Sequence, residues 1–223
     1  LNIGESNSEY EALRKLRAIS KKNEVYSNFI GMGYYGTYTP YVILRNILEN
    51  PGWYTSYTPY QPEVAQGRLE MLLNFQQVIM DLTGMDIANA SLLDEGTAAA
   101  EAVGLCQRLD KSNSKIIFVS SSCNPQTIDI IKTRVEPFGI QLLIGDEDND
   151  LKKIKDKIIC GVLAYPGTLG DIKDPSQTIS IIHKKDGKAI MVCDLLSLAR
   201  LKTPGELGAD IAVGSSQRFG IPM

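Results

Sequence analysis

The chain has 223 residues, with 23 lysines and arginines against 26 aspartates and glutamates, and a formal net charge of −3. This charge gives no reason to expect a nucleic acid or an anionic membrane as partner, and the length suffices for one domain with a sizeable core. Hydrophobic residues make up 43% of the chain, but no apolar run reaches the roughly 20 residues that span a bilayer, and no signal peptide is visible.

Residues 1–65 are expected to form an amino-terminal arm. A short helix is predicted near Glu9 to Ala18, and a second from Tyr41 to Glu49, where Asn50-Pro51-Gly52 ends it. The tyrosine-rich segments before and after this second helix, the latter running from Trp53 to Pro62, are predicted to be loops.

Residues 66–223 are expected to form one large α/β domain. Its first element is an amphipathic helix from Gln66 to Leu82, ended by Gly84. Beyond it, apolar β-branched runs alternate with helical segments, which predicts a doubly wound domain with a buried parallel sheet. The predicted strands are Lys115–Ser120, Ile140–Ile144, Cys160–Tyr165, Ala189–Asp194 and Asp210–Gly214, and the predicted helices are Thr97–Leu109, Asn124–Val135 and Pro175–Lys185.

The side chains that commonly bind metals form no recognisable motif. The spacing of the four cysteines matches no zinc or redox motif, so we expect buried free thiols in a reducing cytoplasm. The acidic cluster from Asp146 to Asp150 lacks the spacing of a calcium loop and is interpreted as a solvated loop. His183, the only histidine, is expected on the surface near a helix end, so a Ser-His-Asp or Cys-His site has little support.

The segment Gly31 to Gly36 matches the glycine spacing of a dinucleotide-binding loop. That motif should follow a strand and open a helix, whereas here tyrosines and Pro40 follow. A nicotinamide-binding oxidoreductase is therefore a weak alternative, and an aromatic loop that approaches another surface closely is the better interpretation.

Glu95, Gly96 and Thr97 stand at the start of an alanine-rich helix. Gly96 would let the backbone approach an anion, and Thr97 could cap the helix while its hydroxyl reaches the same anion. Helix amino termini bind phosphate through exposed amides and the helix dipole, so the segment predicts a phosphate cradle, with plain capping as the alternative.

Asp194 ends a predicted strand at the edge of the sheet where ligands bind. A buried carboxylate there needs a cationic partner. In pyridoxal-phosphate enzymes an aspartate so placed keeps the pyridinium nitrogen protonated.

Two prolines stiffen the segment Tyr57 to Glu63. We interpret this segment as a functional or interface loop rather than an ordinary surface loop.

Four long blocks of the sequence resemble the P-proteins of the glycine cleavage system, also called glycine dehydrogenase (decarboxylating). They are residues 30–63, 92–102 and 202–222 and the NPQT segment after Cys123, and the likeness runs from about Ile19 to Met223. The resemblance implies the large domain of a fold-type-I pyridoxal-phosphate enzyme, in the family's amino-terminal half or subunit 1, cut before its small domain. That enzyme decarboxylates glycine on pyridoxal phosphate and passes the aminomethyl group to the lipoyl arm of H-protein.

In this family the lysine that binds pyridoxal phosphate belongs to the carboxy-terminal half or subunit 2. The resemblance places Gln217 at the corresponding position here, and neither glutamine nor the permanently protonated Arg218 can form an aldimine. We therefore expect pyridoxal phosphate in the assembled enzyme only, held by the other half, and no metal. Asn124 stands where the family often has a histidine that stacks on the cofactor. The residues expected to be vestigial cofactor contacts are Glu95, Gly96, Thr97, Asp194 and Gln217.

The resemblance assigns no certain catalytic residue to this chain, but it implies a role for the tyrosine-rich loops. They would line the glycine site or the lipoyl route through Tyr34, Tyr35, Tyr57, Tyr60, Gln61 and Glu63. The implied partners are the lysine-bearing half, lipoylated H-protein and glycine, in the cytoplasm of a bacterium or in the mitochondrial matrix of a eukaryote. The alternative is a non-catalytic scaffold that stabilises the other half and docks H-protein.

Overall fold

The computed structural model describes residues 4–54 and 62–221. Contacts within the chain divide it into two compact units, Leu1–Ile30 and Gly31–Met223, which are described separately. The expected division into an arm and a large domain after residue 65 stays a prediction.

In residues 4–30, the described part of the first unit, there is one helix, α1 (Glu9–Ser20), where a helix was predicted. Ser8 caps it: the Ser8 hydroxyl accepts from the backbone N–H of Glu11, and the Glu11 carboxylate accepts from the backbone N–H of Ser8. This reciprocal pair satisfies two helix-end donors, which explains why the helix begins here. None of its residues is buried.

The second unit begins with short helical turns. Helix α2 (Tyr41–Ile43) continues into the π-helical turn η1 (Leu44–Leu48), which together match the predicted helix. Helix α3 (Pro51–Tyr54) includes Trp53 and Tyr54, so the prediction of a loop from Trp53 to Pro62 was wrong at its start, while residues 55–61 lie outside the described residues. The start of α3 is stabilised by the Asn50 side chain, which accepts from the N–H of Gly52 at 2.9 Å, and by proline at the first helical position. The long helix α4 (Pro62–Thr83) begins earlier than predicted, also with a proline.

Five parallel strands form one sheet in the order β2-β1-β3-β4-β5. They are β1 (Ile116–Ser120), β2 (Gln141–Gly145), β3 (Cys160–Tyr165), β4 (Lys188–Asp194) and β5 (Ile211–Ser215). Every predicted strand is confirmed, with each boundary within one residue. The carboxyl ends of all five strands therefore meet at one edge of the sheet.

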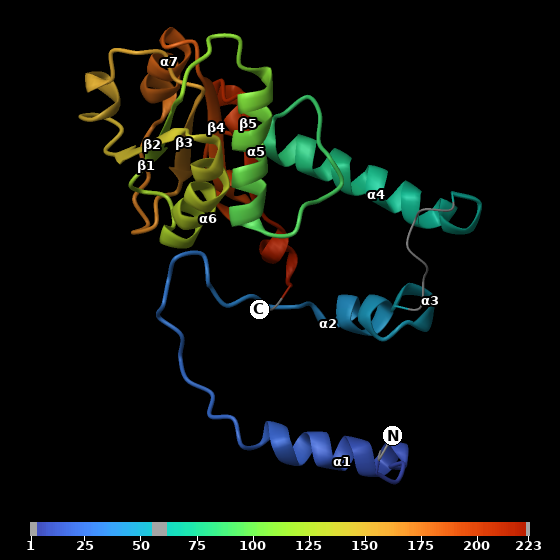
Figure 1. Cartoon of the computed structure of the whole chain (residues 1–223). Coiled ribbons are helices and arrows are strands. Elements are labelled where there is room, and N and C mark those ends of the chain that lie inside the picture. The colour runs from blue at the N-terminus through green and yellow to red at the C-terminus, as the bar shows by residue number, and fades with distance from the viewer. Residues whose placement is uncertain (1–3, 55–61, 222–223) are drawn as a thin grey trace. The chain divides into compact units, whose positions relative to one another are not determined.

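Helices cover both faces of the sheet (Figure 1). On one face α5 (Glu95–Leu109) and α6 (Pro125–Val135) pack over Ile117 and Val119 of β1. On the other face α7 (Ser176–Lys184) packs with Phe118. Neighbouring residues of a strand point to opposite faces, so both cores are apolar and the strands read as continuous hydrophobic runs. The remaining short elements are α8 (Leu195–Leu198), α9 (Pro204–Leu207), η2 (Glu136–Phe138), η3 (Leu151–Lys153) and η4 (Ser216–Phe219).

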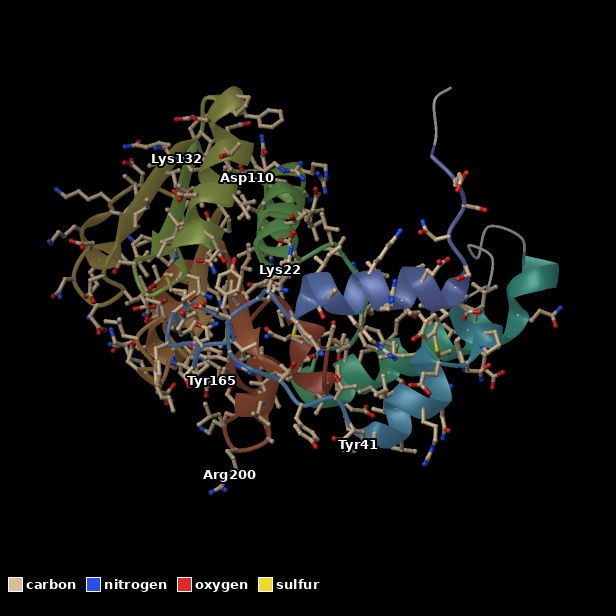
Figure 2. The ribbon with its side chains drawn as sticks, turned by 90° about the horizontal axis from the view of Figure 1, so that it is seen from below. Lys22, Tyr41, Asp110, Lys132, Tyr165 and Arg200 are labelled. Carbon is tan, nitrogen blue, oxygen red and sulfur yellow. The ribbon has the colours of Figure 1, made fainter. Side chains whose placement is uncertain are left out.

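Charged side chains lie mainly on the surface and apolar side chains form the core. Polar side chains such as Lys132 on α6 are exposed, whereas Tyr165 at the end of β3 is buried (Figure 2). All four cysteines are free and buried, which confirms the predicted burial of free thiols, whereas the reducing compartment stays a prediction. Among the helices that the structure describes, none has the length and apolarity required to cross a membrane.

Candidate functional site at the carboxyl edge of the sheet

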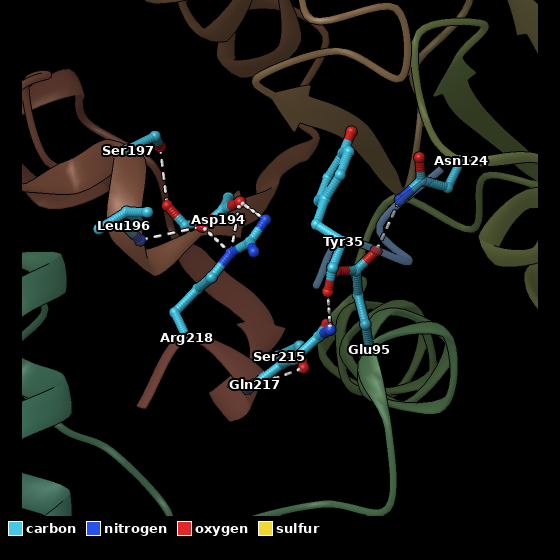
Figure 3. Close-up of polar contacts among 9 residues, drawn as sticks. All are labelled: Tyr35, Glu95, Asn124, Asp194, Leu196, Ser197, Ser215, Gln217 and Arg218. Atoms are coloured by element: carbon cyan, nitrogen blue, oxygen red, sulfur yellow. Dashed lines mark hydrogen bonds and ion pairs between the residues drawn. The ribbon is translucent and has the colours of Figure 1, made fainter. Parts of the chain in front are cut away.

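A cavity of about 230 Å³ opens at the carboxyl ends of β3, β4 and β5. Ligands bind at this edge in open α/β sheets. The cavity also receives the start of α5, the residue before α6, and the loop that contains Tyr35 (Figure 3). Its polar lining residues include Tyr35, Glu95, Asn124, Asp194, Ser215, Gln217 and Arg218.

Asp194 forms an ion pair with Arg218 at the cavity wall. The Nε of Arg218 lies 3.0 Å from both carboxylate oxygens, and its Nη2 lies 2.6 Å from Oδ2. The same carboxylate accepts from the N–H of Leu196 at 2.9 Å and so caps α8. The Asp194 side chain is 27% exposed and that of Arg218 16%, so the pair is largely removed from water. Arg218 is thus the cationic partner that a carboxylate at this strand end requires.

Gln217 and Arg218 both contact Tyr35. The buried Gln217 donates from Nε2 to the backbone carbonyl of Tyr35 at 2.7 Å. The guanidinium carbon of Arg218 lies 4.9 Å from the centroid of the Tyr35 ring, within the range of a cation–π contact. Gln217, which the resemblance places at the lysine position, therefore contacts the loop that contains Tyr35.

Glu95 lies in the same cavity, as the first residue of α5. Burial raises the pKa of the Glu95 carboxyl, and this is partly opposed by hydrogen bonds from Asn124 and Thr127, at 3.2 and 3.4 Å. These donors come from α6 and its N-cap, so Glu95 links the starts of α5 and α6.

The cap of α5 differs from the prediction. Asp94, not Thr97, is the N-cap residue: its carboxylate accepts from the backbone N–H of Thr97 at 2.7 Å. The Thr97 hydroxyl also donates to Asp94, at 3.0 Å, so its proton is already used locally. An ionised carboxylate accepts more strongly than a hydroxyl at the positive end of a helix, which explains the exchange of roles.

Gly96 has a packing reason to be glycine. A Cβ at this position would lie 2.4 Å from Cδ1 of Ile130, so the missing side chain lets α5 approach α6. The expected roles of Glu95, Gly96 and Thr97 as vestigial phosphate contacts stay predictions.

The segment Gly31 to Gly36 is an irregular loop. Gly31, Met32 and Gly33 have positive φ values, and the next helix begins only at Tyr41. No strand precedes the loop in the described part of the chain. This context differs from that of a dinucleotide-binding motif.

The other tyrosine-rich loop lies largely outside the structural description. Tyr57, Tyr60 and Gln61 fall outside the described residues, as does the side chain of Glu63. In the first loop Tyr34 is 44% exposed and Tyr35 41% exposed. The assignment of these side chains to a substrate or lipoyl route stays a prediction.

Two other polar clusters lie away from the cavity. His183 is in the last turn of α7, where its Nε2 lies 2.8 Å from Oδ2 of Asp210, a contact that sequence spacing did not reveal. Asp146 caps its own turn by accepting from the N–H groups of Asp148 and Asn149, as a solvated loop would. Within the described residues, no cluster of histidine, cysteine, aspartate and glutamate could hold a metal ion.

The parallel sheet with helices on both faces and a cavity at its carboxyl edge is the large-domain fold of fold-type-I pyridoxal-phosphate enzymes. Two distant solved structures share this fold. One is SspA in complex with cysteine, at a TM-score of 0.65 and 14% identity over 82% of this chain and 55% of that chain. The other is a C-DES mutant with glycine covalently linked to its PLP cofactor, at a TM-score of 0.61 and 14% identity over 84% of this chain and 53% of that chain.

Closer comparisons define the family. The family model for the glycine cleavage system P-protein matches residues 1–223, so the chain belongs to this family, as the sequence resemblance predicted. It is 77% identical to the glycine dehydrogenase (decarboxylating) of Pelagibacter ubique and 53% identical to that of Rhodopseudomonas palustris, over all 223 residues and 23% of each relative. A crystal structure of inhibitor-bound glycine decarboxylase (P-protein) matches with a TM-score of 0.88 and 32% identity, over the whole of this chain and 51% of that one.

Proposed function

We propose that this chain is part of the amino-terminal half of a glycine decarboxylase of the glycine cleavage system. The family match over residues 1–223 carries this proposal. The activity belongs to the assembled enzyme, because the chain spans only 23% of the curated relatives that it matches. That enzyme decarboxylates glycine on pyridoxal phosphate and transfers the aminomethyl group to the lipoyl arm of H-protein.

The cavity of this chain does not fit pyridoxal phosphate. None of the described residues that line it is a lysine, and an aldimine requires an amine. The Asp194 carboxylate that would bind a pyridinium nitrogen is already paired with Arg218. Glu95 places a carboxyl group at the start of α5, where a phosphate would need a donor or a cation. These three features support a cofactor held by the lysine-bearing half.

The contribution of this half would be the tyrosine-rich loops. Tyr34 and Tyr35 are exposed residues, and a phenol can donate and accept hydrogen bonds. We assign them, with the second loop that contains Tyr57, Tyr60, Gln61 and Glu63, to the glycine site or to the entry route of the lipoyl arm. The partners are then the lysine-bearing half and lipoylated H-protein.

The test uses the full-length protein loaded with pyridoxal phosphate. Carboxyl-labelled glycine is supplied with lipoylated H-protein, and labelled carbon dioxide is counted. We expect release that depends on both H-protein and glycine, whereas alanine labelled in the same position serves as the substrate control. A cofactor-loaded enzyme that releases no label from glycine would refute the proposed function.

A further inference from the structure

The loop Gly31 to Pro40 is held against the turn that replaces the cofactor lysine. We propose that Gln217 and Arg218 are positioning residues, which fix this loop so that the phenols of Tyr34 and Tyr35 are presented in one orientation to the reacting half. We call the contacts of Gln217 and Arg218 with this loop the clamp. The clamp rests on those contacts, and only its catalytic consequence rests on the proposed function.

Tyr35 is held at both its backbone and its ring. Gln217 is 7% exposed and directs its Nε2 to the Tyr35 carbonyl, at 2.7 Å. Arg218 lies against the Tyr35 ring and is itself fixed by its hydrogen bonds to Asp194. Contacts therefore connect the end of β4, through the ion pair of Asp194 with Arg218, to Tyr35 in the loop (Figure 3).

Further contacts hold the later part of the loop, at Thr37 and Thr39. The Thr37 hydroxyl donates to the Ile221 carbonyl at 2.9 Å, and the Thr39 hydroxyl donates to the Gly220 carbonyl. Gly220 has a φ of 97°, and a Cβ there would lie 2.9 Å from the Tyr38 carbonyl oxygen, so the two backbones are in close approach.

A third anchor holds the start of the loop. Gln126 of α6 donates from Nε2 to the Met32 carbonyl at 2.6 Å. At Gly33 an added Cβ would lie 3.2 Å from Nδ2 of Asn124, so the chain passes close to the start of α6. The loop is thus tied to two separate elements, α6 and η4.

These contacts hold the loop, and in Tyr35 they hold the ring as well as the backbone. Met32, between Gly31 and Gly33, has a φ of 53°, a left-handed conformation that persists in a non-glycine residue only when its surroundings support it. Ordering a free loop costs conformational entropy, so anchoring in advance removes this cost from the catalytic cycle. Tyr34 and Tyr35 nevertheless remain 44% and 41% exposed. A tyrosine whose backbone and ring are held in this way within an exposed loop is suited to orienting a bound molecule.

The test uses two substitutions in the full-length enzyme. Gln217→Met keeps a side chain of similar length without a donor, and Arg218→Lys keeps the charge beside Asp194 without the planar guanidinium. The matched controls are Gln141→Met on β2 and Arg134→Lys on α6, whose ion-pair partner is Glu101. The first readout is amide hydrogen exchange of residues 31–40. We expect exchange about tenfold faster in Gln217→Met and Arg218→Lys, and unchanged in both controls.

The second readout separates positioning from stability. We expect kcat for glycine decarboxylation to fall about tenfold, while bound pyridoxal phosphate and the KM for lipoylated H-protein stay within about twofold of wild type. Unchanged exchange would overturn the clamp, and faster exchange with unchanged kcat would overturn the positioning role. A wild-type enzyme that does not decarboxylate glycine would refute the proposed function and with it the catalytic consequence, whereas the exchange result would still decide the clamp.

Discussion

Arg218 reaches back to Asp194 with three N–H···O contacts of 2.6 to 3.0 Å, and so joins the turn η4 to the end of β4. Both side chains lie largely out of water. In a cofactor-binding site of this fold, the aspartate at this strand end would face a pyridinium nitrogen. Here the guanidinium of Arg218 supplies the positive charge, so the Asp194 carboxylate has its cationic partner within the chain.

The first prediction concerns this ion pair. Arg218→Met should destabilise the local structure by about 2 kcal/mol, because Asp194 is left partly buried and unpaired. Native-state hydrogen exchange of β5 and η4 amides in the full-length protein measures the change. Arg134→Met removes an exposed pair with Glu101 and should cost below about 0.5 kcal/mol. A cost for Arg218→Met no larger than this control, or one not reduced when Asp194→Asn is added, would contradict the assignment.

The second prediction concerns pH. Burial raises the pKa of Glu95 above its usual 4.5. The folded protein then binds this proton more tightly than the unfolded chain, so the unfolding free energy falls as the pH rises from about 4.5 through the raised pKa. Glu95→Gln keeps an oxygen acceptor for Asn124 and should be more stable than wild type at pH 7, but not at pH 4.

Local unfolding free energies of α5 at a series of pH values test the Glu95 prediction. Glu70→Gln, at an exposed position of α4, is the control and should leave the pH profile unchanged. A Glu95→Gln profile parallel to that of wild type would show that Glu95 makes no such contribution.

The fold could be predicted from the sequence because its signals are local. Strands buried on both faces give runs of β-branched residues, and all five were located from those runs. The start of α4 and the short helix α3 were missed because a proline and an asparagine cap outweighed the turn signals around them. Thr97 was predicted to cap α5, whereas Asp94, three residues before it, is the N-cap residue.

The site was predictable only in part. Asp194 and Glu95 were singled out from their places at a strand end and a helix start, and Gln217 from the family resemblance. All three line one cavity. The contact between Gln217 and Tyr35 joins residues 182 positions apart, and no periodic pattern encodes such a separation. The fold alone brings the loop to this turn, so the clamp became visible only in three dimensions.

The third prediction compares two glycines of α5. Gly96→Ala should destabilise the contact between α5 and α6 by about 1 kcal/mol, because the new methyl group displaces Ile130. Gly104→Ala should stabilise the same helix by about 0.5–1 kcal/mol, since its Cβ would meet only Nη1 of Arg108 at 3.4 Å. Hydrogen exchange of α5 amides gives both values. Equal effects of the two substitutions would refute the packing role of Gly96.

The fourth prediction separates a site role from a scaffold role. Tyr34→Phe and Tyr35→Phe remove only hydroxyls, so turnover in the full-length enzyme should fall about tenfold if either phenol hydrogen-bonds the reacting molecules. The control is Tyr10→Phe on the exposed face of α1. Size-exclusion chromatography checks that the assembly is intact. Unchanged turnover in both variants would leave only the scaffold role for this loop.

The central claim is that this chain belongs to an enzyme whose cofactor is bound by another half. The most direct measurement is borohydride reduction of the full-length, pyridoxal-phosphate-loaded protein, followed by digestion and mass spectrometry of the modified peptide. We predict a stoichiometric pyridoxyl-lysine outside residues 1–223 and unmodified lysines within them. A stoichiometric adduct on any lysine of this chain would contradict the account, because it would show a cofactor site that Gln217, Arg218 and Glu95 are argued to preclude.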